Sequence, residues 1–429
     1  MQESVAVFLL IGLFAVMIIC HLPVTFAMVI ATATTMLYLN IPMMTMVQQM
    51  AKSVNSFSLL AIPFFILMGE IMGAGGISDR LLKFANVLVG RFRGGLAFVN
   101  VLASMFFGGI SGSAVADVSS LGKIEIPMME DAGYDKDFSI CVTVSSACQG
   151  LLIPPSHNMV LYAMTAGGVS VGKLFLAGYA PGILLGVALM ALCYIFAIKR
   201  NYPKGDPVSF KEALVITKDA VFAIGAMFII VGGVVAGLFT ATEAAAIGCI
   251  YCLLVATLVY RQLSLKDMGR ILYNTVKTLA MIYSLIAAAG AFAWMMAYLR
   301  IPAKFTGILM DVSDNKIVVL LLINVLLLLL GCIMDMAPLI LIMTPILLPV
   351  VQKFGMDPVQ FGIMLIANLA IGLLTPPVGS CLYAGCAVGG AKIEKVTKCM
   401  LPFYLTMVVV LLIITFIPAL SMTLPNLMM

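Results

Sequence analysis

The sequence predicts a polytopic membrane protein built from α-helices. Of its 429 residues, 63% are hydrophobic and 10% are charged, and the mean hydropathy is +1.15. Apolar runs recur at lengths near the roughly 20 residues that a helix needs to cross a bilayer. The sequence lacks the short segments of alternating polarity that are typical of an outer-membrane barrel. The net charge of +5 is small and dispersed along the chain, so nucleic acid is not an expected partner.

Two halves of the chain carry the same breaks. The stretch GLLIPPSHN has a counterpart in IGLLTPPVGS, where the proline pair that starts at Pro376 follows the pair that starts at Pro154 by 222 residues. At the same offset, thirteen of the 65 positions from Gly109 to Lys173 carry the same residue in both halves, and eight of the thirteen are glycine or proline. Because these residue types determine where a helix bends, the halves share their backbone breaks and not merely their hydrophobicity.

Basic residues predict how the two halves are oriented. The polar linker 199–219 is rich in lysine and arginine, so we expect it in the cytoplasm. Lys173 then lies outside, whereas its counterpart Lys395 stands in a basic triplet typical of a cytoplasmic loop. This difference predicts inverted halves. Both termini are then expected in the periplasm, if the host is Gram-negative and the protein lies in its inner membrane.

Segment 106–122 contains glycine and serine and lies between two points that are both predicted to be cytoplasmic, so it cannot be a full crossing. A re-entrant helical hairpin is expected there, and another in the second half. The predicted first repeat is 1–198, with scaffold helices 1–93, hairpin 94–137, broken helix 138–172 and scaffold helix 173–198. After the linker, the second repeat is 220–429, with scaffold helices 220–315, hairpin 316–358, broken helix 359–394 and C-terminal helix 395–429.

The proline pairs have a chemical consequence. Each pair removes two backbone donors and leaves carbonyl groups unpaired, which is costly in a membrane unless protein, a cavity or a cation satisfies them. A simple kink is the alternative, since single prolines are tolerated in transmembrane helices. Two matched breaks in inverted halves favour a central binding site, as in transporters with broken helices.

The hairpin tips and broken helices supply the candidate sodium ligands. Sodium is a hard cation that prefers oxygen, and these segments offer hydroxyl groups and free carbonyl groups together. The candidates are Ser111, Ser113, Gly150, Pro154 and Asn158 in the first half, and Gly331, Asp335, Thr375 and Gly379 in the second. Close helix packing through small residues is the alternative explanation for the two serines.

Substrate-binding candidates are the polar residues of the same segments: Ser111, Asp117, His157, Asp335 and Ser380. An ionisable group inside the membrane is a functional-site hypothesis by default. For Asp117 an ion pair with Lys123 is the alternative, and for His157 the alternative is a hydrogen bond to a carbonyl group freed by the prolines.

Four segments, GGISGSAVAD, LLIPPSHN, GCIMDMAP and LLTPPVGSCLY, together resemble the large membrane subunit of tripartite ATP-independent periplasmic (TRAP) transporters, the DctM family. The resemblance covers essentially the whole chain. It implies the ion transporter superfamily fold, with two inverted repeats, two re-entrant hairpins and two broken helices. It also implies an elevator motion driven by a sodium gradient, with at least two sodium sites at the hairpin-tip and broken-helix residues given above.

The resemblance also implies partners: a small four-helix membrane subunit, expected as a separate polypeptide, a periplasmic substrate-binding protein and the membrane lipids. The imported organic acid is expected to be sialic acid or a C4-dicarboxylate. A single-subunit sodium/dicarboxylate symporter of the same superfamily is the alternative, and dependence on a binding protein would separate the two. An enzyme is not expected, because a hydrolase needs a nucleophile with a base or a metal cluster, and His21 and His157 are the only histidines.

Overall fold

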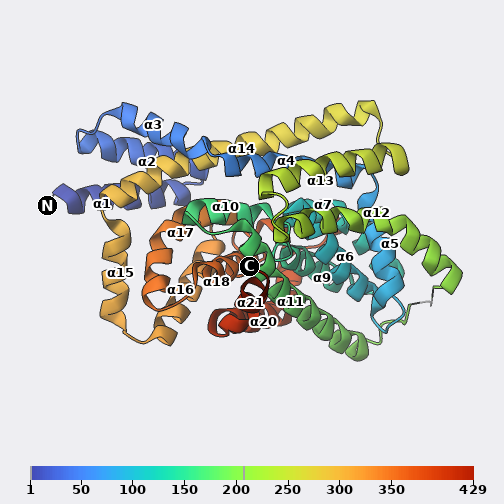
Figure 1. Cartoon of the computed structure of the whole chain (residues 1–429). Helices are drawn as coiled ribbons and strands as arrows, with labels where there is room; N and C mark the ends of the chain where they lie inside the picture. Colours follow the sequence, from blue (N-terminus) through green and yellow to red (C-terminus); the bar gives the residue numbers. More distant parts are fainter. Residues whose placement is uncertain (1, 206–207) are drawn as a thin grey trace.

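The computed structural model describes residues 2–205 and 208–429, apart from the side chains at 58, 109–111, 265, 308–309 and 311–312. Over those residues the chain forms helices and no β-strand (Figure 1). Within the described part, seven helices are long and apolar enough to cross a membrane, or up to eight if one bent pair is counted as a span. The prediction of an all-α polytopic membrane protein is therefore confirmed.

The first half contains eleven α-helices and one short 3₁₀-helix. They are α1 (Gln2–Ile19), α2 (Val24–Tyr38), α3 (Met43–Val54), η1 (Phe57–Leu60), α4 (Ala61–Ala74), α5 (Ile77–Val89), α6 (Gly95–Ser111), α7 (Ala114–Ser120), α8 (Gly122–Asp131), α9 (Lys136–Gly150), α10 (His157–Ala166) and α11 (Val171–Lys199). The bent pair consists of α4 and α5, whose axes meet at 71°.

The second half follows the same order. Its helices are α12 (Phe210–Val235), α13 (Ala241–Leu254) with the π-helical turn η2 (Val255–Val259), α14 (Leu265–Tyr298), α15 (Ile301–Val312), α16 (Lys316–Gly331), α17 (Met336–Lys353), α18 (Pro358–Gly372), α19 (Ser380–Gly389), α20 (Ile393–Phe416) and α21 (Pro418–Met428). Several bounds keep the offset of 222 residues: α9 ends at Gly150 and α18 at Gly372, and α11 begins at Val171 and α20 at Ile393.

Two boundaries differ from the sequence-based expectation. Helix α12 begins at Phe210, so the second part of the predicted linker 199–219 is helical and carries its polar residues on the first turns of a long helix. The predicted C-terminal helix is divided into α20 and α21 at Ile417, directly before Pro418. Proline has no N–H to continue the helical hydrogen bonds, which explains the break.

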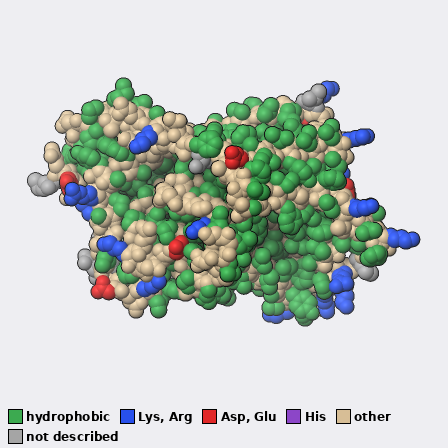
Figure 2. All heavy atoms as spheres, viewed as in Figure 1, with side chains coloured by type: hydrophobic (Ala, Val, Ile, Leu, Met, Phe, Trp, Pro, Cys, Tyr) green, Lys and Arg blue, Asp and Glu red, His purple; other side chains and the backbone are tan. Residues whose placement is uncertain are grey.

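The two helices before the proline pairs form the centre of the bundle. Every residue of α9 from Phe138 to Gly150 and of α18 from Val359 to Gly372 is buried. Helix α1 is the opposite case, because only Ala6 and Leu10 are buried along its length. Hydrophobic side chains cover much of the face seen in Figure 2, and lysine and arginine side chains project at its right-hand edge. Such a surface is typical of a protein whose outer helices face lipid.

Candidate functional site

The first chain reversal lies between α6 and α7. Gly112 has a φ of +63°, a conformation that glycine adopts readily, and Ser113 is the N-cap of α7. The Ser113 hydroxyl accepts a hydrogen bond of 3.3 Å from the backbone N–H of Ala116. A Cβ atom at position 112 would overlap the ring of His157, so glycine allows α10 to lie against this tip.

The second chain reversal lies between α16 and α17. Asp335 is the N-cap residue of α17, as Ser113 is of α7, and the two positions are 222 residues apart. Asp335 is exposed, and its carboxylate lies at the N-terminal end of an 18-residue helix. The partial positive charge of that helix end favours a negatively charged group there.

The proline pairs lie in the interruptions of the two central helices. The first interruption runs from 151 to 156, between α9 and α10, and the second from 373 to 379, between α18 and α19. Gly379, with a φ of +33°, is the last residue of the second interruption. Interrupted helices in a bundle leave backbone carbonyl groups without helical partners, and these carbonyl groups can bind a cation.

Hydrogen bonds join each chain reversal to the neighbouring broken helix. The Asn158 side-chain amide donates to the carbonyl oxygen of Gly112 at 3.1 Å. The Ser380 hydroxyl donates to Oδ1 of Asp335 at 2.9 Å. Asn158 and Ser380 are also 222 residues apart, so equivalent positions donate to the two tips, although Asn158 bonds to a backbone carbonyl oxygen and Ser380 to a side-chain carboxylate.

Glycine contacts hold the same elements together at short range. A Cβ atom on Gly372 would lie 2.6 Å from the Cα of Gly331, and one on Gly150 would lie 2.9 Å from the Cα of Gly108. No real side chain tolerates such distances to backbone. Glycine is therefore needed for α16 to touch α18, and for α6 to touch α9.

Buried polar contacts reinforce both pairs of helices. In the first half the Ser146 hydroxyl donates to Oδ1 of Asn100 at 2.6 Å. In the second half the Asn368 amide donates to Oδ1 of Asn324 at 3.0 Å. All four residues are at most 3% exposed. Hydrogen bonds between buried polar side chains fix the register of the helices that carry them in an apolar interior.

A cavity of about 110 Å³ lies where the two halves meet. Its walls combine both chain reversals with both broken helices: Gly112–Val115, Leu151, His157, Asn158, Asp335–Ala337 and Leu373. Hydroxyl, amide, imidazole and carboxylate groups thus converge on one small space. This space is the candidate site.

The structure places the predicted site residues differently. Ser113, His157, Asn158 and Asp335 line the cavity, and Ser380 reaches it through its bond to Asp335. Gly150 and Gly331 make the glycine contacts between helices. Pro154 is buried in the first interruption, and Gly379 is the last residue of the second interruption. The Thr375 hydroxyl donates to the Ile371 carbonyl oxygen at 2.8 Å. The side chain of Ser111 lies outside the described residues.

Asp117 does not line the cavity. It is 1% exposed, and neither carboxylate oxygen has a hydrogen-bond partner among the described residues. Lys123, the partner considered from sequence, is exposed. The Nδ1 atom of His157 is likewise buried without a hydrogen-bond partner in the described part of the chain.

Sequence reasoning missed two residues of this region. Gly112 supplies the carbonyl oxygen that Asn158 binds, and only its place between two serines in SGS pointed to a turn. Glu125 on α8 is fully buried with no hydrogen-bond partner among the described residues. Its position eight residues after Asp117 is compatible with the same helix face, but sequence alone does not show that this face is inside.

An ion pair outside the spanning segments fixes the start of α9. Arg200, just after α11, lies 2.6 Å from Oδ2 of Asp135, and the Tyr202 hydroxyl donates to the same oxygen at 2.7 Å. The hydrogen bond from Tyr202, together with Arg200, lowers the pKa of the Asp135 carboxyl from its ordinary value. The negative charge of Asp135 is thereby stabilised at the N-cap of α9.

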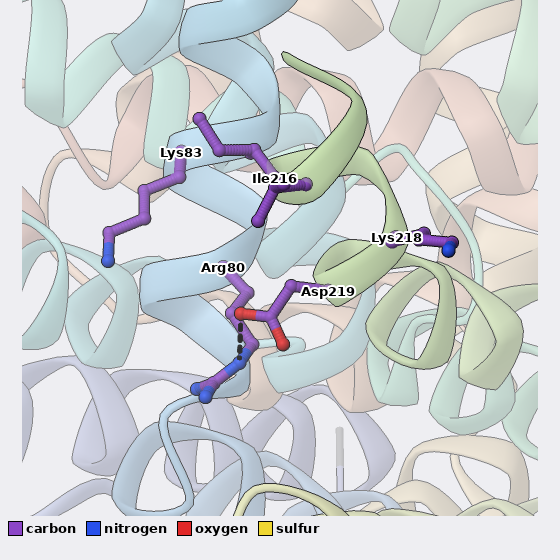
Figure 3. A pocket seen from close by; sticks show the side chains of 6 residues that line it. Arg80, Lys83, Ile216, Lys218 and Asp219 are labelled. Atoms are coloured by element: carbon purple, nitrogen blue, oxygen red, sulfur yellow. Dashed lines mark ion pairs between the residues drawn. The ribbon is translucent and has the colours of Figure 1, made fainter. Parts of the chain in front are cut away.

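A larger polar cavity between α5 and α12 lacks the convergence of the candidate site. Its Arg80 Nε lies 2.9 Å from an oxygen of Asp219, and the Arg80 guanidinium also lies 3.6 Å from the ring centre of Tyr260. In Figure 3 the side chains of Lys83 and Lys218 point away from each other. Arg80 therefore joins helices here, and the two lysines do not form one binding site.

Comparisons with known proteins agree on one family. The family model "Tripartite ATP-independent periplasmic transporter, DctM component" matches residues 11–420. The chain is 42% identical to YgiK of Salmonella typhimurium, a protein described as uncharacterized, over 98% of this chain and 97% of that protein. It is 39% identical to the sialic acid TRAP transporter large permease protein SiaM of Vibrio cholerae, over 89% of each chain.

A longer relative and a solved structure add to this result. The isethionate TRAP transporter permease protein DctMQ of Oleidesulfovibrio alaskensis is 39% identical over 96% of this chain and 65% of that protein. The YdaH transporter of Alcanivorax borkumensis superposes with a TM-score of 0.65 at 15% identity, covering 89% of this chain and 88% of that chain. At that identity the structural likeness concerns the fold alone.

Proposed function

Because the chain belongs to the DctM component family of tripartite ATP-independent periplasmic transporters, we propose that it imports an organic acid into a bacterium with energy from a sodium gradient. As a member of that family it is a multi-pass transporter permease and not an enzyme. The acid is sialic acid or a C4-dicarboxylate. The observation that carries this proposal is the convergence of two chain reversals and two broken helices on one cavity.

Sodium binds at the two tips. Asp335 supplies a carboxylate, Ser113 a hydroxyl, and the residues around Gly150, Pro154, Thr375 and Gly379 supply carbonyl oxygens near the breaks. Sodium prefers hard oxygen ligands of these kinds. Two tips at equivalent positions give at least two ion sites. Support comes from the hydrogen bonds of Asn158 and Ser380, which connect each tip to its broken helix.

Transport follows an elevator mechanism in inverted repeats. The hairpins and broken helices move with the ions and the acid against the scaffold helices. One observation supports the inversion: Lys173 and Lys395 have different charge surroundings.

The acid arrives from a periplasmic binding protein, and a small membrane subunit completes the complex in the inner membrane. Both termini of this chain lie in the periplasm. The word tripartite in the family description supports these partners. The similarity to SiaM, which is named as a sialic acid permease, supports sialic acid as the substrate.

Uptake of radiolabelled sialic acid into proteoliposomes tests the proposal. The vesicles contain this chain and its small subunit, with or without the binding protein. The proposal predicts uptake only when the binding protein is present. Uptake that needs sodium but no binding protein would instead establish the single-subunit symporter, and uptake of a C4-dicarboxylate in place of sialic acid would change only the substrate.

A further inference from the structure

A second cavity lies beside the candidate site and has a different chemical character. Its volume is about 330 Å³, and its walls come from α3, α10, α14 and α17. Lys52, at the C-terminal end of α3, is its only charged lining residue among the described side chains. Within the described part of the chain, Lys52 forms no ion pair. The ammonium group is therefore available to an anion.

The other lining groups suit the remainder of a small organic acid. Ile286, Ala289 and Leu341 are apolar lining residues, whereas Gln49 and Ser56 add polar groups to the lining. Binding sites for small molecules commonly combine an apolar lining with a few polar groups that fix orientation. One lysine in such a cavity favours a ligand with a single carboxylate at one end.

Size separates the two cavities. A protein cavity of about 150 Å³ is known to hold benzene. The cavity at the chain reversals, at about 110 Å³, is smaller than that and can surround only part of a sugar acid. The second cavity has about three times that volume. It can therefore surround more of the body of such an acid than the smaller cavity can.

The two cavities lie along the same two helices. Helix α10 begins with His157 and Asn158 at the smaller cavity and continues to Thr165 at the larger one. Helix α17 begins with Met336 at the smaller cavity and reaches Leu341 at the larger one. The proposed ion sites and the second cavity are thus neighbours.

The position of Lys52 is fixed by a tight helix contact. A Cβ atom on Gly290 of α14 would overlap the Ser53 side chain, so α3 packs closely on α14. The Ser53 hydroxyl donates to the Gln49 carbonyl oxygen at 2.7 Å and is not free to donate to a ligand. The residue next to Ser53 is Lys52, so this contact places the backbone of Lys52 at the edge of the cavity, which its exposed side chain lines.

We propose that this second cavity is the carboxylate-binding subsite for the imported acid, with the Lys52 ammonium group binding the carboxylate and the apolar wall contacting the carbon body. The proposal rests on the proposed function, because it concerns the same transported acid. Two of the walls, α3 and α14, belong to the proposed scaffold, and the other two belong to the proposed moving part. Movement of the hairpins would therefore change the subsite and release the acid.

Uptake kinetics of the reconstituted complex test this subsite, with sialic acid as the probe. For Lys52→Met we expect the KM for sialic acid to rise about tenfold or more, since a hydrogen bond to a charged group is lost. Lys52→Arg should restore most of the affinity. Lys277→Met removes an exposed lysine of α14 that does not line the cavity, so its KM should match the wild type.

Two further measurements separate this subsite from the ion sites and from misfolding. The sodium concentration for half-maximal uptake should stay unchanged in Lys52→Met. Ala293→Leu, which adds bulk to the cavity wall without changing its charge, should also raise the KM for sialic acid.

A KM within twofold of the wild type for Lys52→Met would overturn the subsite while the proposed function stands. Wild-type complex that takes up neither sialic acid nor a C4-dicarboxylate would overturn the proposed function, and the subsite with it.

Discussion

The Ser380 hydroxyl donates a hydrogen bond of 2.9 Å to Oδ1 of Asp335, across 45 positions of the chain. This bond joins the second chain reversal to the start of α19 and orients the carboxylate at the central cavity. If Asp335 binds sodium, a change at either residue should alter the response of transport to sodium.

Ser380→Ala should raise the sodium concentration for half-maximal uptake. A hydrogen bond to a charged group contributes about 1.5 kcal/mol or more, so the increase should be about tenfold. Asp335→Asn should have a larger effect, because it removes the negative charge itself. Thr397→Ala is a matched control, since among the described residues its hydroxyl donates to the Ile393 carbonyl oxygen of its own helix. A sodium response equal to that of the wild type in Asp335→Asn would remove this carboxylate from the ion sites.

Asn158→Asp should impair the first tip. The aspartate cannot donate the hydrogen bond that the Asn158 amide gives to the Gly112 carbonyl oxygen, and a carboxylate would face that oxygen instead. The expected loss is about tenfold in the sodium-dependent uptake rate. The measurement is initial uptake at a fixed sodium gradient, with the exposed Asn426→Asp as control. Unchanged uptake would show that the bond is dispensable.

Gly372→Ala should destabilise the bundle. Its new methyl group would lie 2.6 Å from the Cα of Gly331, and overpacking of an interior typically costs about 1–3 kcal/mol. Gly73→Ala provides the control, because nothing lies within 4 Å of a Cβ atom there. In that control the better helix propensity of alanine should leave stability unchanged or slightly raised. Thermal unfolding in detergent checks both, and equal melting temperatures would contradict the contact.

Tyr202→Phe should change how stability depends on pH. The Tyr202 hydroxyl lowers the pKa of Asp135 in the folded protein, so the charged carboxyl stabilises the fold above its unfolded pKa of about 3.9. That contribution is lost as pH falls through the folded pKa. The variant should therefore melt lower than the wild type at pH 7, and the difference should shrink below about pH 4. A pH-independent difference would point to lost packing instead.

The sequence predicts those parts of the fold that depend on single strong signals. Pro154 and Pro376 mark the regions where the structure interrupts α9 and α18, because proline cannot continue helical hydrogen bonding. Hydrophobic runs identify the spans, and this class of fold is confirmed by the helices found. Asp335 is recognisable as a polar residue between apolar runs, and the structure places it at the central cavity.

Other parts of the site depend on how distant helices pack, which sequence does not specify. The contact of Gly331 with Gly372 needs two helices in a particular register. The burial of Glu125 depends on which face of α8 is covered. Lys52 belongs to an amphipathic helix with no buried residue, so its sequence pattern describes a surface helix and not the wall of a cavity.

Simultaneous counting of labelled sodium and labelled sialic acid entering the same proteoliposomes tests the central claim most directly. The account predicts that sodium enters together with the acid, at two or more ions per molecule, and only when the binding protein is present. Asp335→Asn should reduce both fluxes. Accumulation of the acid without any sodium entry, in vesicles that hold the complete complex, would contradict the account.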